Sequence, residues 1–407
     1  MLRVIHIKII YISISPLPHL SGHGISLDLL RELKKNGHEI YVVASNERRN
    51  NTPTYLQEEE GSKVLRVKIG NNKNTNIIEK GISNLLLPYQ YIAAIKKFFK
   101  GVKFDLVLYP TPPVTQVSTV AYLKKRDHAK TYLLLKDIFP QNAVDIGMMT
   151  KTGPKSIIYK MFRKKEKNLY KISDKIGCMS QANVDYVLKH NPYVNPENIH
   201  VCPNAIEVFD YEKDLAKRIA IREKWNIPQD KVVFVYGGNL GKPQNIPFII
   251  ECMKANAHRD DCFFVICGKG TEYKKLAAYY EKEKPKNLLL LNGLPKEEYE
   301  DFVKAFDVGL IFLDHRFTIP NFPSRLLSYM QAKLPVIACT DPNTDIGRVI
   351  ETGGFGIWNE SNDPANFTAA IDKMLAADLT TMGNAGFSYL KEHYTAEKAC
   401  KILLSNM

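Results

Sequence analysis

The 407-residue sequence predicts an α/β fold of two Rossmann-like domains, each built on a doubly wound, mainly parallel sheet. Three observations predict it. Short aliphatic and β-branched runs alternate with amphipathic stretches, which is the pattern of strand–helix–strand units. This alternation stops at Pro203-Asn204 and resumes with an apolar run at 232–236. The length suits two domains, which we place at 1–203 and 204–385, and we expect a C-terminal helix at about 386–407 to pack back on the first domain.

The first domain is predicted to be a series of strand–helix units. Val4–Ile14 is rich in β-branched residues, and its apolar run is interrupted by polar residues and stops at Pro16, so we interpret it as a first strand and not as a signal peptide. A Pro/Gly loop follows at 15–24, and then an amphipathic helix that ends at Asn36-Gly37, a common helix C-cap. Further strands are expected at 39–44, 64–67, 104–109, 131–135, 175–179 and 198–202, a polar loop at 46–61, and helices at 25–35, 82–100, 114–124 and 155–171.

Charge is distributed unevenly along the chain. The net charge is +13, and residues 1–203 hold 31 Lys and Arg against 16 Asp and Glu, whereas the remainder holds 25 against 27. A basic first half indicates an anionic partner: a membrane surface, a polyphosphate substrate or nucleic acid. The seven cysteines form no C-x-x-C pair, so we expect buried thiols in a reducing compartment, with neither a disulfide framework nor a metal site.

One predicted helix of the first domain is a candidate for contact with a membrane surface, and a second one carries a basic surface. No stretch reaches the roughly eighteen apolar residues that span a bilayer. Residues 82–100 are apolar and aromatic and end in a cluster of lysines, which is typical of a helix lying on a membrane and also of a packed helix with a cationic C-terminus. Residues 155–171 carry a run of Lys and Arg, which forms either a basic docking surface or an ordinary solvated face.

Polar residues at strand ends give the candidate site of the first domain. Lys136 and Asp137 follow the predicted strand at 131–135, and open α/β sheets bind ligands at the carboxyl ends of their strands. The plain alternative is a local ion pair that closes the sheet edge. His19 and His23 lie in the first loop, where a neutral imidazole either orients or deprotonates a hydroxyl or is simply a solvated, hydrogen-bonding side chain.

The second domain places glycines directly after its strands. Gly237-Gly238, Gly268–Gly270 and Gly293 follow three of them, and glycine lets a backbone approach a ligand closely. Together with a helix N-terminus, such loops indicate a nucleotide-diphosphate site. The first loop of the chain does not match G-x-G-x-x-G, so a dinucleotide site is poorly supported. Strands are expected at 232–236, 262–267, 288–291 and 308–312, helices at 213–226 and 246–255, and two or three helices at 363–407.

The stretch Phe317–Thr340 completes this predicted site. It predicts a loop, a helix with Pro323 in its first turn, and a buried strand. Free N–H groups of Ser324, Arg325 and Leu326 would face the preceding loop with the positive end of the helix dipole behind them, which makes an anion site. The planar guanidinium of Arg325 suits phosphate oxygens. The alternative is that Arg325 is solvated and Ser324 only caps the helix.

In their order and spacing, these motifs resemble the two-domain GT-B glycosyltransferases, and among them the retaining family 4, in particular the fucosaminyltransferase-like enzymes of bacterial O-antigen and capsule synthesis. The resemblance covers nearly the whole chain. The matching pieces are Gly37-His38-Glu39-Ile40, Asp137-Ile138-Phe139-Pro140, Pro203-Asn204-Ala205, Tyr236–Lys242 with Gln244, Cys267–Gly270, Phe322–Arg325 and Lys333–Ala338.

The resemblance implies two domains that face a cleft, with a UDP-sugar held mainly by the second domain and an acceptor met by the first. The implied chemistry replaces the nucleotide at the anomeric carbon with retention, and the leaving diphosphate helps to deprotonate the acceptor hydroxyl, without a cofactor or a divalent metal. Asp137, Lys136 and His23 are the candidate catalytic residues, and His19, Gly22 and Gly24 are the candidate acceptor contacts. The implied donor-binding residues are Gly238, Asn239, Lys242, Gly268, Lys269, Gly270, Leu294, Pro323, Ser324, Arg325, Leu326 and Ser328.

The sequence departs from the family pattern at three places. The two glutamates that most family 4 enzymes carry fall on Pro320 and Ser328, the usual Arg/Lys pair for the diphosphate falls on Asn239 and Gln244, and the histidine of the first domain falls on Lys136. These changes concern ribose, phosphate and catalytic contacts. The subgroup with the D-[LI]-[WF]-P motif shares much of this pattern, so we interpret them as subgroup features and not as loss of activity.

The leading hypothesis is a retaining glycosyltransferase that acts in the cytoplasm, bound peripherally to the anionic surface of the inner membrane, on a lipid-diphosphate-linked saccharide. A GT-B-shaped nucleotide-sugar epimerase is the second hypothesis, and isomerisation of free UDP-sugar without an acceptor would favour it. A nucleic-acid-binding protein would explain the basic half. The sequence carries no helix-turn-helix, zinc or aromatic-platform signature, however, so we expect no nucleic-acid partner.

Overall fold

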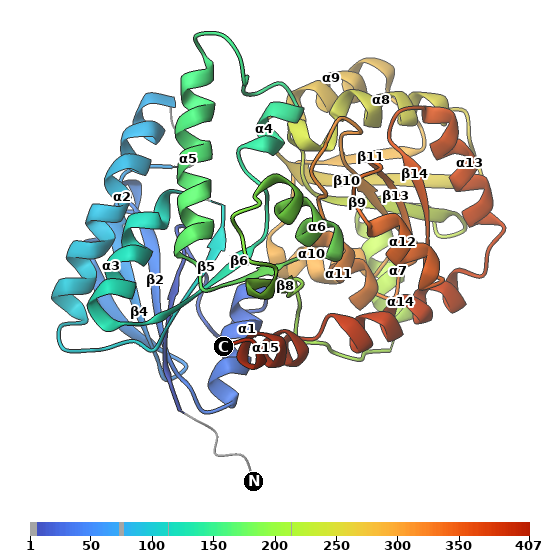
Figure 1. The fold of residues 1–407 in the computed structure, drawn as a ribbon. Coiled ribbons are helices and arrows are strands. Elements are labelled where there is room, and N and C mark those ends of the chain that lie inside the picture. Colours follow the sequence, from blue (N-terminus) through green and yellow to red (C-terminus); the bar gives the residue numbers. More distant parts are fainter. Residues whose placement is uncertain (1–5, 73–76, 113, 213) are drawn as a thin grey trace. The chain divides into compact units, whose positions relative to one another are not determined.

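The computed structural model describes residues 6–72, 77–112, 114–212 and 214–407, which form two compact units (Figure 1). Unit 1 consists of Met1–Glu207 together with Ala396–Met407, and unit 2 consists of Val208–Thr395. The chain therefore leaves unit 1 and later returns to it. The two crossing points lie side by side in unit 1, because the backbone N–H of Ala396 donates a hydrogen bond to the carbonyl of Ile206 at 2.9 Å.

Unit 1 is built on an eight-stranded sheet with the order β3-β4-β2-β1-β5-β6-β7-β8. Neighbouring strands pair in parallel except β3 and β4, which form an antiparallel hairpin. Because β5 lies between β1 and β6, the segments that follow these three strands emerge together at one edge of the sheet. The strands are β1 (Lys8–Ile12), β2 (Glu39–Glu47), β3 (Tyr55–Glu59), β4 (Ser62–Ile69), β5 (Leu106–Thr111), β6 (Lys130–Leu135), β7 (Lys175–Cys178) and β8 (Ile199–Val201).

Helices cover both faces of this sheet. On one face, α1 and α15 pack together and bury Leu30, Leu33, Cys400 and Leu403 against the sheet. On the other face, α2 and α5 both contact α3 and the short turn η2, as Figure 1 shows for the three helices. The helices are α1 (Ile25–Lys35), α2 (Ile77–Phe98), α3 (Val117–Asp127), α4 (Gln141–Asp145), α5 (Ser156–Ile172), α6 (Gln181–His190) and α15 (Ala396–Ser405), with 3-10 turns η1 (Arg48–Asn50), η2 (Val114–Gln116) and η3 (Pro196–Asn198).

Unit 2 has a six-stranded parallel sheet with the order β11-β10-β9-β12-β13-β14. Its strand order reverses between β9 and β12, and such a switch point is where open α/β sheets bind ligands. The strands are β9 (Val232–Asn239), β10 (Cys262–Lys269), β11 (Leu288–Leu291), β12 (Val308–Phe312), β13 (Val336–Thr340) and β14 (Gly356–Glu360). The helices are α7 (Leu215–Lys224), α8 (Ile246–Ala255), α9 (Tyr273–Glu283), α10 (Lys296–Val303), α11 (Arg325–Gln331), α12 (Ile346–Thr352), α13 (Pro364–Leu375) and α14 (Leu379–His393), with a 3-10 turn η4 (Lys242–Gln244).

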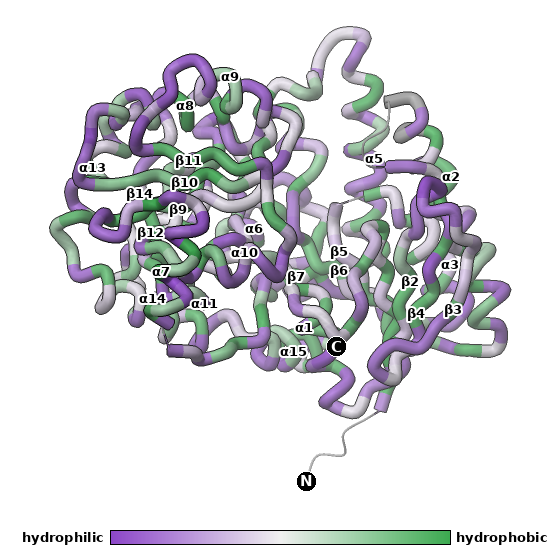
Figure 2. Tube along the Cα trace, turned by 180° about the vertical axis from the view of Figure 1, so that it is seen from behind, coloured by the Kyte–Doolittle hydropathy of each residue, from purple (hydrophilic) through white to green (hydrophobic). Residues whose placement is uncertain are grey.

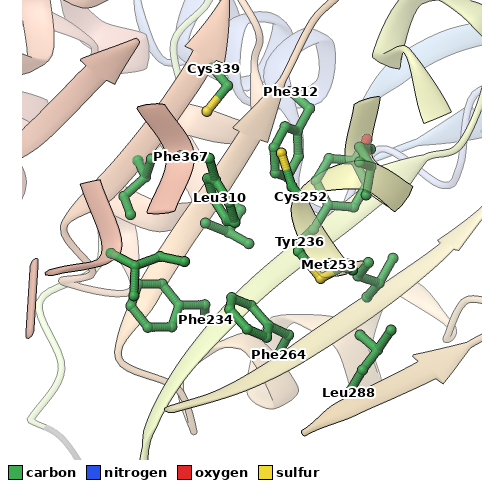
Figure 3. Close-up of a cluster of buried hydrophobic side chains, with 14 of the residues drawn as sticks. Phe234, Tyr236, Cys252, Met253, Phe264, Leu288, Leu310, Phe312, Cys339 and Phe367 are labelled. Carbon is green, nitrogen blue, oxygen red and sulfur yellow. The ribbon is translucent and has the colours of Figure 1, made fainter. Parts of the chain in front are cut away.

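The core of unit 2 lies between its sheet and the helices α8 and α13. Phe234 on β9, Phe264 on β10, Phe312 on β12 and Phe367 on α13 are buried there, and their rings contact one another (Figure 3). The strands β10 and β11 are correspondingly hydrophobic in Figure 2, whereas many of the segments around them are hydrophilic. A rigid core of this kind fixes the strand ends that carry the candidate site.

The structure corrects three of the predicted elements. The polar segment 46–61 is not simply a loop, because it holds the end of β2, η1 and the edge strand β3, in which Leu56 and Glu58 are exposed and Glu59 is buried. The single helix expected at about 386–407 is two helices that belong to different units. Pro323 precedes α11, which begins at Arg325.

The strand β14 and the helices α4, α6, α9, α10 and α12 were not predicted. The remaining strands and most other helices lie within a few residues of the predicted ranges. All seven cysteines are buried and free. Across the described residues, none of the helices combines the length and the apolar character that crossing a bilayer needs.

Candidate functional site

Arg325 is the centre of the candidate site in unit 2. It is the first residue of α11, and its guanidinium lies over the ring of Tyr236 at 4.3 Å from the ring centroid. It also borders Gly238 at the end of β9, where a Cβ atom would lie 3.4 Å from Arg325 Nη2. Gly238 has a φ of 129°, a conformation that suits glycine. The structure thus brings together two predicted donor-binding residues that are far apart in the sequence.

The surroundings of Arg325 leave its charge unpaired. Its Nη1 atom is buried and makes no hydrogen bond to any of the described residues. Three tyrosines surround the guanidinium, and burial raises the pKa of Tyr236 and Tyr299 and raises the pKa of Tyr329 to about 12. All three are therefore neutral near pH 7, while an arginine remains charged. A partly buried cation without a counter-ion is suited to an anionic ligand.

The tyrosines also hold the backbone of this site in place. Tyr329 Oη accepts a hydrogen bond from the N–H of Gly237 at 3.2 Å and lies 3.1 Å from the carbonyl of Val235 and 3.0 Å from that of Leu310. The hydroxyl of Tyr299 occupies the place that a side chain on Gly237 would take. Gly237 is thus required by packing against Tyr299. Neither Tyr299 nor Tyr329 was among the predicted site residues.

The N-terminus of α11 differs from the expectation. The N–H of Leu326 donates to the carbonyl of Pro323 at 3.2 Å, so it is not free for an anion. Within the described part of the chain, the structure records no acceptor for the N–H groups of Ser324 and Arg325. The side chains of Ser324 and Ser328 are exposed, and Ser324 makes no capping hydrogen bond. The anion site therefore depends on the Arg325 side chain more than on the helix end.

Gly268, which lies within β10 and not after it as predicted, and Gly270, which follows β10, serve the contact between the ends of β9 and β10. A Cβ atom on Gly268 would lie 2.1 Å from the carbonyl oxygen of Gly238, and one on Gly270 would lie 2.2 Å from that of Leu240. The N–H of Leu240 donates to the carbonyl of Lys269 at 2.9 Å. These glycines therefore let the ends of β9 and β10 touch directly. They had been predicted only to let the backbone approach a ligand.

The other predicted donor-binding residues lie at the ends of neighbouring strands. The alkyl chain of Lys269 packs over Gly293, which precedes Leu294 in the segment after β11, and Leu294 is half-buried. Lys242 is exposed at the start of η4. Because β10 lies between β9 and β11, these three loops share one edge of the sheet.

The turn between β9 and η4 is closed by two amide side chains. Asn239 Nδ2 donates to Gln244 Oε1 at 2.8 Å, and the backbone N–H of Gly241 donates to the same oxygen at 3.1 Å. Gln244 is buried. The two residues that stand in place of the family's charged pair thus bind each other and shape the loop.

Asp137 is a buried carboxyl group at the candidate site of unit 1. It follows β6, and its Oδ2 atom accepts a hydrogen bond from Asn142 at 2.7 Å. Its Oδ1 atom is buried and has no partner among the described residues. Burial raises the pKa of Asp137 from its usual value to about 6. A carboxyl group with one unused oxygen and such a pKa is suited to receive or orient a proton at the strand edge.

Lys136 does not form the ion pair with Asp137 that was considered from the sequence. Within the described ranges, no carboxylate pairs with its ammonium group, and burial lowers the pKa of Lys136. The thiols of Cys178 and Cys202 are its titratable neighbours. Its backbone N–H donates to Thr111 Oγ1 at 3.2 Å, which ties the segment after β6 to the end of β5.

The first loop is held by Arg31 on α1. The Arg31 guanidinium binds Asp28 Oδ1 at 2.6 Å and Glu207 Oε2 at 2.8 Å, and it donates to His23 Nδ1 at 3.2 Å. Ligand atoms of His23, Asp28 and Glu207 lie within 4.8 Å of one another, as a metal site would require. The Arg31 guanidinium already supplies a cation to these three groups. No local pattern in the sequence points to Arg31 or Glu207, since the two paired residues are 176 positions apart.

The other residues of this loop are bound to their own neighbours. His19 Nδ1 lies 2.8 Å from Ser21 Oγ, and the N–H of Gly22 donates to the carbonyl of His19 at 2.9 Å. Gly24 has a φ of 144° and precedes α1, where its N–H donates to Asp28 Oδ1 at 3.0 Å. Both histidines are half-exposed, hydrogen-bonded loop residues, and their role toward an acceptor stays a prediction.

Comparison with known proteins gives matches for both halves of the chain. Residues 26–208 match the family described as Glycosyltransferase Family 4, and residues 217–386 match the family described as Glycosyl transferases group 1. The chain is 26% identical over 329 residues to the "Probable glycosyltransferase WbjE" of Pseudomonas aeruginosa, covering 80% of this chain and 78% of that protein. It is 21% identical to the "Putative colanic acid biosynthesis glycosyl transferase WcaI" of Escherichia coli K12, covering 90% and 92%.

Solved structures share the fold over nearly the whole chain. The sucrose-phosphate synthase of Thermosynechococcus elongatus has a TM-score of 0.74 at 13% identity and covers 98% of both chains. Anabaena Alr3699/HepE, solved in complex with UDP-glucose, has a TM-score of 0.70 at 12% identity and covers 99% of this chain and 100% of its own.

Proposed function

Because the chain is a glycosyltransferase with a GT-B fold of the family 4 type, we propose that it transfers a sugar from a UDP-sugar to a lipid-diphosphate-linked saccharide. The transfer retains the configuration at the anomeric carbon and extends a cell-surface polysaccharide of the O-antigen or capsule type. We place the protein at the cytoplasmic face of the inner membrane, since a lipid-linked acceptor is presented at a membrane surface.

The observation that carries this proposal is the unpaired guanidinium of Arg325. It lies beside Gly238 at the topological switch point of unit 2, with one buried N–H group that no described residue accepts. A nucleotide diphosphate supplies the anionic oxygens that this group lacks, and arginine binds them with paired hydrogen bonds. We assign further hydrogen-bond donors to the nucleotide-sugar substrate. These are the backbone N–H groups of Ser324 and Arg325 and the side chains of Lys242 and Lys269, which lie in the strand-end loops.

Two comparisons support the donor and the pathway. HepE, which shares the fold, was solved with UDP-glucose bound. The E. coli relative is named for colanic acid biosynthesis, a polysaccharide pathway. The fucosaminyltransferase-like subgroup remains our proposal on the residues of the D-[LI]-[WF]-P motif, Asp137-Ile138-Phe139-Pro140.

In the proposed mechanism the protein stabilises charge that develops on the leaving diphosphate. Arg325 meets this charge in a partly buried site, where its field is stronger than in water. The leaving phosphate takes part in deprotonating the acceptor hydroxyl, and the free Oδ1 atom of Asp137 orients that hydroxyl or receives its proton. We propose that the reaction needs no cofactor or divalent metal, since Arg325 and the neighbouring lysines provide the positive charge.

A thermal-shift screen with UDP, GDP, dTDP, ADP and NAD tests the donor. A ligand at a hundredfold its dissociation constant adds about 2.7 kcal/mol of stability. Selective stabilisation by UDP is expected, a preference for GDP changes the donor, and no response to any nucleotide overturns the proposal.

A transfer assay then tests the reaction. Purified protein, UDP-sugars and lipid-diphosphate-linked acceptors are incubated, and the product's anomeric configuration is read by NMR. A new glycosidic bond with the donor's configuration is expected. Isomerisation of the UDP-sugar in the absence of acceptor would identify an epimerase instead.

A further inference from the structure

Unit 1 exposes large apolar side chains in two groups. Leu85, Leu86 and Tyr89 on α2 are 56%, 50% and 72% exposed, and Ile157, Ile158 and Met161 on α5 are 71%, 53% and 41% exposed. We call these six residues the apolar ridge. An exposed leucine alone means little, but two such groups on α2 and α5, which both contact α3 and η2, are apolar surface of the kind that marks a binding site.

The packing of α2 does not require its part of the ridge. Leu87, Tyr91 and Ile95 recur at a spacing of four residues and are fully buried. Leu85, Leu86 and Tyr89 lie on a different side of the same helix and stay exposed. The helix thus has one apolar face that packs within unit 1 and a second one that faces solvent.

The α5 part of the ridge lies at the same edge of the sheet as Asp137. The helix α2 leads into β5, and α5 leads into β7, and both strands belong to the parallel part of the sheet. Such helices run opposite to the strands, so the first turns of α5, with Ile157, Ile158 and Met161, lie at the carboxyl ends of the strands. Leu85, Leu86 and Tyr89 lie further along α2, which begins at Ile77. The turn η2, which follows the carboxyl end of β5, contacts both helices.

Positive charge accompanies the ridge. Residues 146–172 hold eight Lys and Arg and one acidic residue, Glu166. Glu166 is buried, where it binds Arg163 at 2.5 Å and accepts from Tyr170 at 2.9 Å, so the exposed charged residues of α5 are all lysines. Residues 82–100 hold three lysines and no acidic residue.

We propose that the apolar ridge and the lysines of α5 dock the protein on an anionic lipid bilayer. Apolar side chains enter the interface while lysine chains reach the lipid headgroups. A second copy of this chain is a poorer occupant, because a two-fold contact would place the lysines of both copies against each other. Nucleic acid would use the lysines but not the leucines and isoleucines.

Docking in this way would place the acceptor-binding part of unit 1 at the membrane surface. The carboxyl edge of the sheet, with Asp137, comes to the lipid–water interface, where a lipid-linked acceptor presents its diphosphate and sugar. This part of the inference rests on the proposed function, whereas binding to the bilayer does not depend on the donor or on turnover.

Co-sedimentation of the full chain with vesicles tests the proposal. Vesicles of zwitterionic phosphatidylcholine are compared with vesicles containing about one-third phosphatidylglycerol. Binding to the anionic vesicles is expected, and it should fall at least tenfold in the variant Leu85→Ser with Ile157→Ser, since each buried CH₂ contributes about fourfold to the partition constant. The variant Lys160→Gln with Lys164→Gln should bind about fivefold less for each lysine.

Matched controls separate docking from general stickiness. Leu215 and Ile219 on α7 of unit 2 are 66% and 38% exposed, so Leu215→Ser with Ile219→Ser removes comparable apolar surface elsewhere and should leave vesicle binding unchanged. Lys274→Gln with Lys282→Gln on α9 is the corresponding charge control. Equal losses in ridge and control variants would overturn the proposal, as would unchanged binding in the ridge variants.

A depth measurement completes the test. Tyr89→Trp places an indole on the ridge, whereas the native Trp225 and Trp358 lie in unit 2. Brominated lipids should quench the added fluorescence in anionic vesicles, and no quenching would overturn the proposal. A ridge variant that loses vesicle binding but keeps its UDP-induced thermal shift separates this inference from the donor site. Sedimentation velocity tests self-association through the ridge. We expect no concentration-dependent dimer of the free protein, and a dimer that the ridge variants abolish would overturn the proposal.

Discussion

Asn239 donates a hydrogen bond of 2.8 Å to Gln244, and by resemblance these two amides occupy the positions of a cationic pair that binds diphosphate in family 4 enzymes. The Gln244 oxygen also accepts from the N–H of Gly241, so a single amide holds the turn closed. The pair is neutral. The guanidinium of Arg325, beside Gly238, is therefore the cation on which we expect the diphosphate contact to depend.

Replacement of Arg325 by glutamine should abolish donor binding without harming the fold. The guanidinium has no counter-ion among the described residues, so its loss leaves no charge unpaired. We expect kcat/KM for the donor to fall by about 10²- to 10³-fold and the UDP-induced thermal shift to disappear. Arg348 on α12 is 71% exposed and pairs with Asp345, so Arg348→Gln is the matched control and should change neither quantity. An intact UDP shift in Arg325→Gln would move the donor site elsewhere.

Asp137→Asn should stabilise the protein while it slows turnover. The pKa of Asp137 is raised from 3.8 to about 6, so the unfolded chain releases this proton at lower pH than the folded one. The ionised side chain therefore opposes folding. The penalty is absent below about pH 4, grows between the two pKa values and is complete above about pH 6.

At pH 7.5 the asparagine variant should gain up to about 3 kcal/mol in the free energy of unfolding, since one pKa unit corresponds to 1.36 kcal/mol. Its turnover should fall by about a hundredfold or more if the carboxylate receives a proton. Chemical denaturation at pH 4.5 and 7.5, together with initial rates, measures both effects. If the variant differed from the native protein by the same free energy of unfolding at both pH values, the carboxyl group would not be buried. Unchanged turnover would remove Asp137 from the site.

Gly270→Ala should disrupt the contact between the ends of β9 and β10. The added methyl group would lie 2.2 Å from the carbonyl oxygen of Leu240, which belongs to the backbone and cannot rotate away. We expect a loss of about 1–3 kcal/mol in stability and a raised KM for the donor. Gly147→Ala, where the methyl meets open space but φ is 71°, isolates the cost of the backbone conformation. A smaller loss at Gly270 than at Gly147 would contradict this account.

A double-mutant cycle measures the bond between Asn239 and Gln244. Either alanine variant should lose about 1 kcal/mol of stability, as is typical for one hydrogen bond between neutral groups. The double variant should lose less than the sum, because the two residues share that bond. Unfolding by urea gives the four free energies. Strict additivity would mean that the turn is held by other contacts.

The strands and their order of appearance follow from apolar periodicity, which is why the helices at 25–35 and 246–255 and the strands at 288–291 and 308–312 match their predicted bounds. The edge strand β3 was missed because an exposed strand lacks an apolar face, and its pairing with β4 is a non-local property.

The candidate site was predictable at residues whose type indicates a specific role, such as a glycine beside a ligand or an arginine that binds phosphate. Gly238 and Arg325 were expected to serve the same ligand, and the structure places them side by side. The tyrosines around Arg325 were not predictable, since Tyr299 lies in a charged stretch with no motif. Arg31 and Glu207 were missed for a similar reason, because an ion pair across 176 positions has no local signature.

The return of the chain at Ala396 has a consequence for how this protein is made and altered. Unit 2 is a contiguous cassette inserted into unit 1 at a single point, since Ile206 and Ala396 are hydrogen-bonded neighbours. Cys400 and Leu403 belong to the core of unit 1, so this core is complete only after the ribosome has made all of unit 2. Unit 2 is therefore synthesised in full before unit 1 is complete. We therefore expect that the cassette can be exchanged with that of a relative while α15 stays in place.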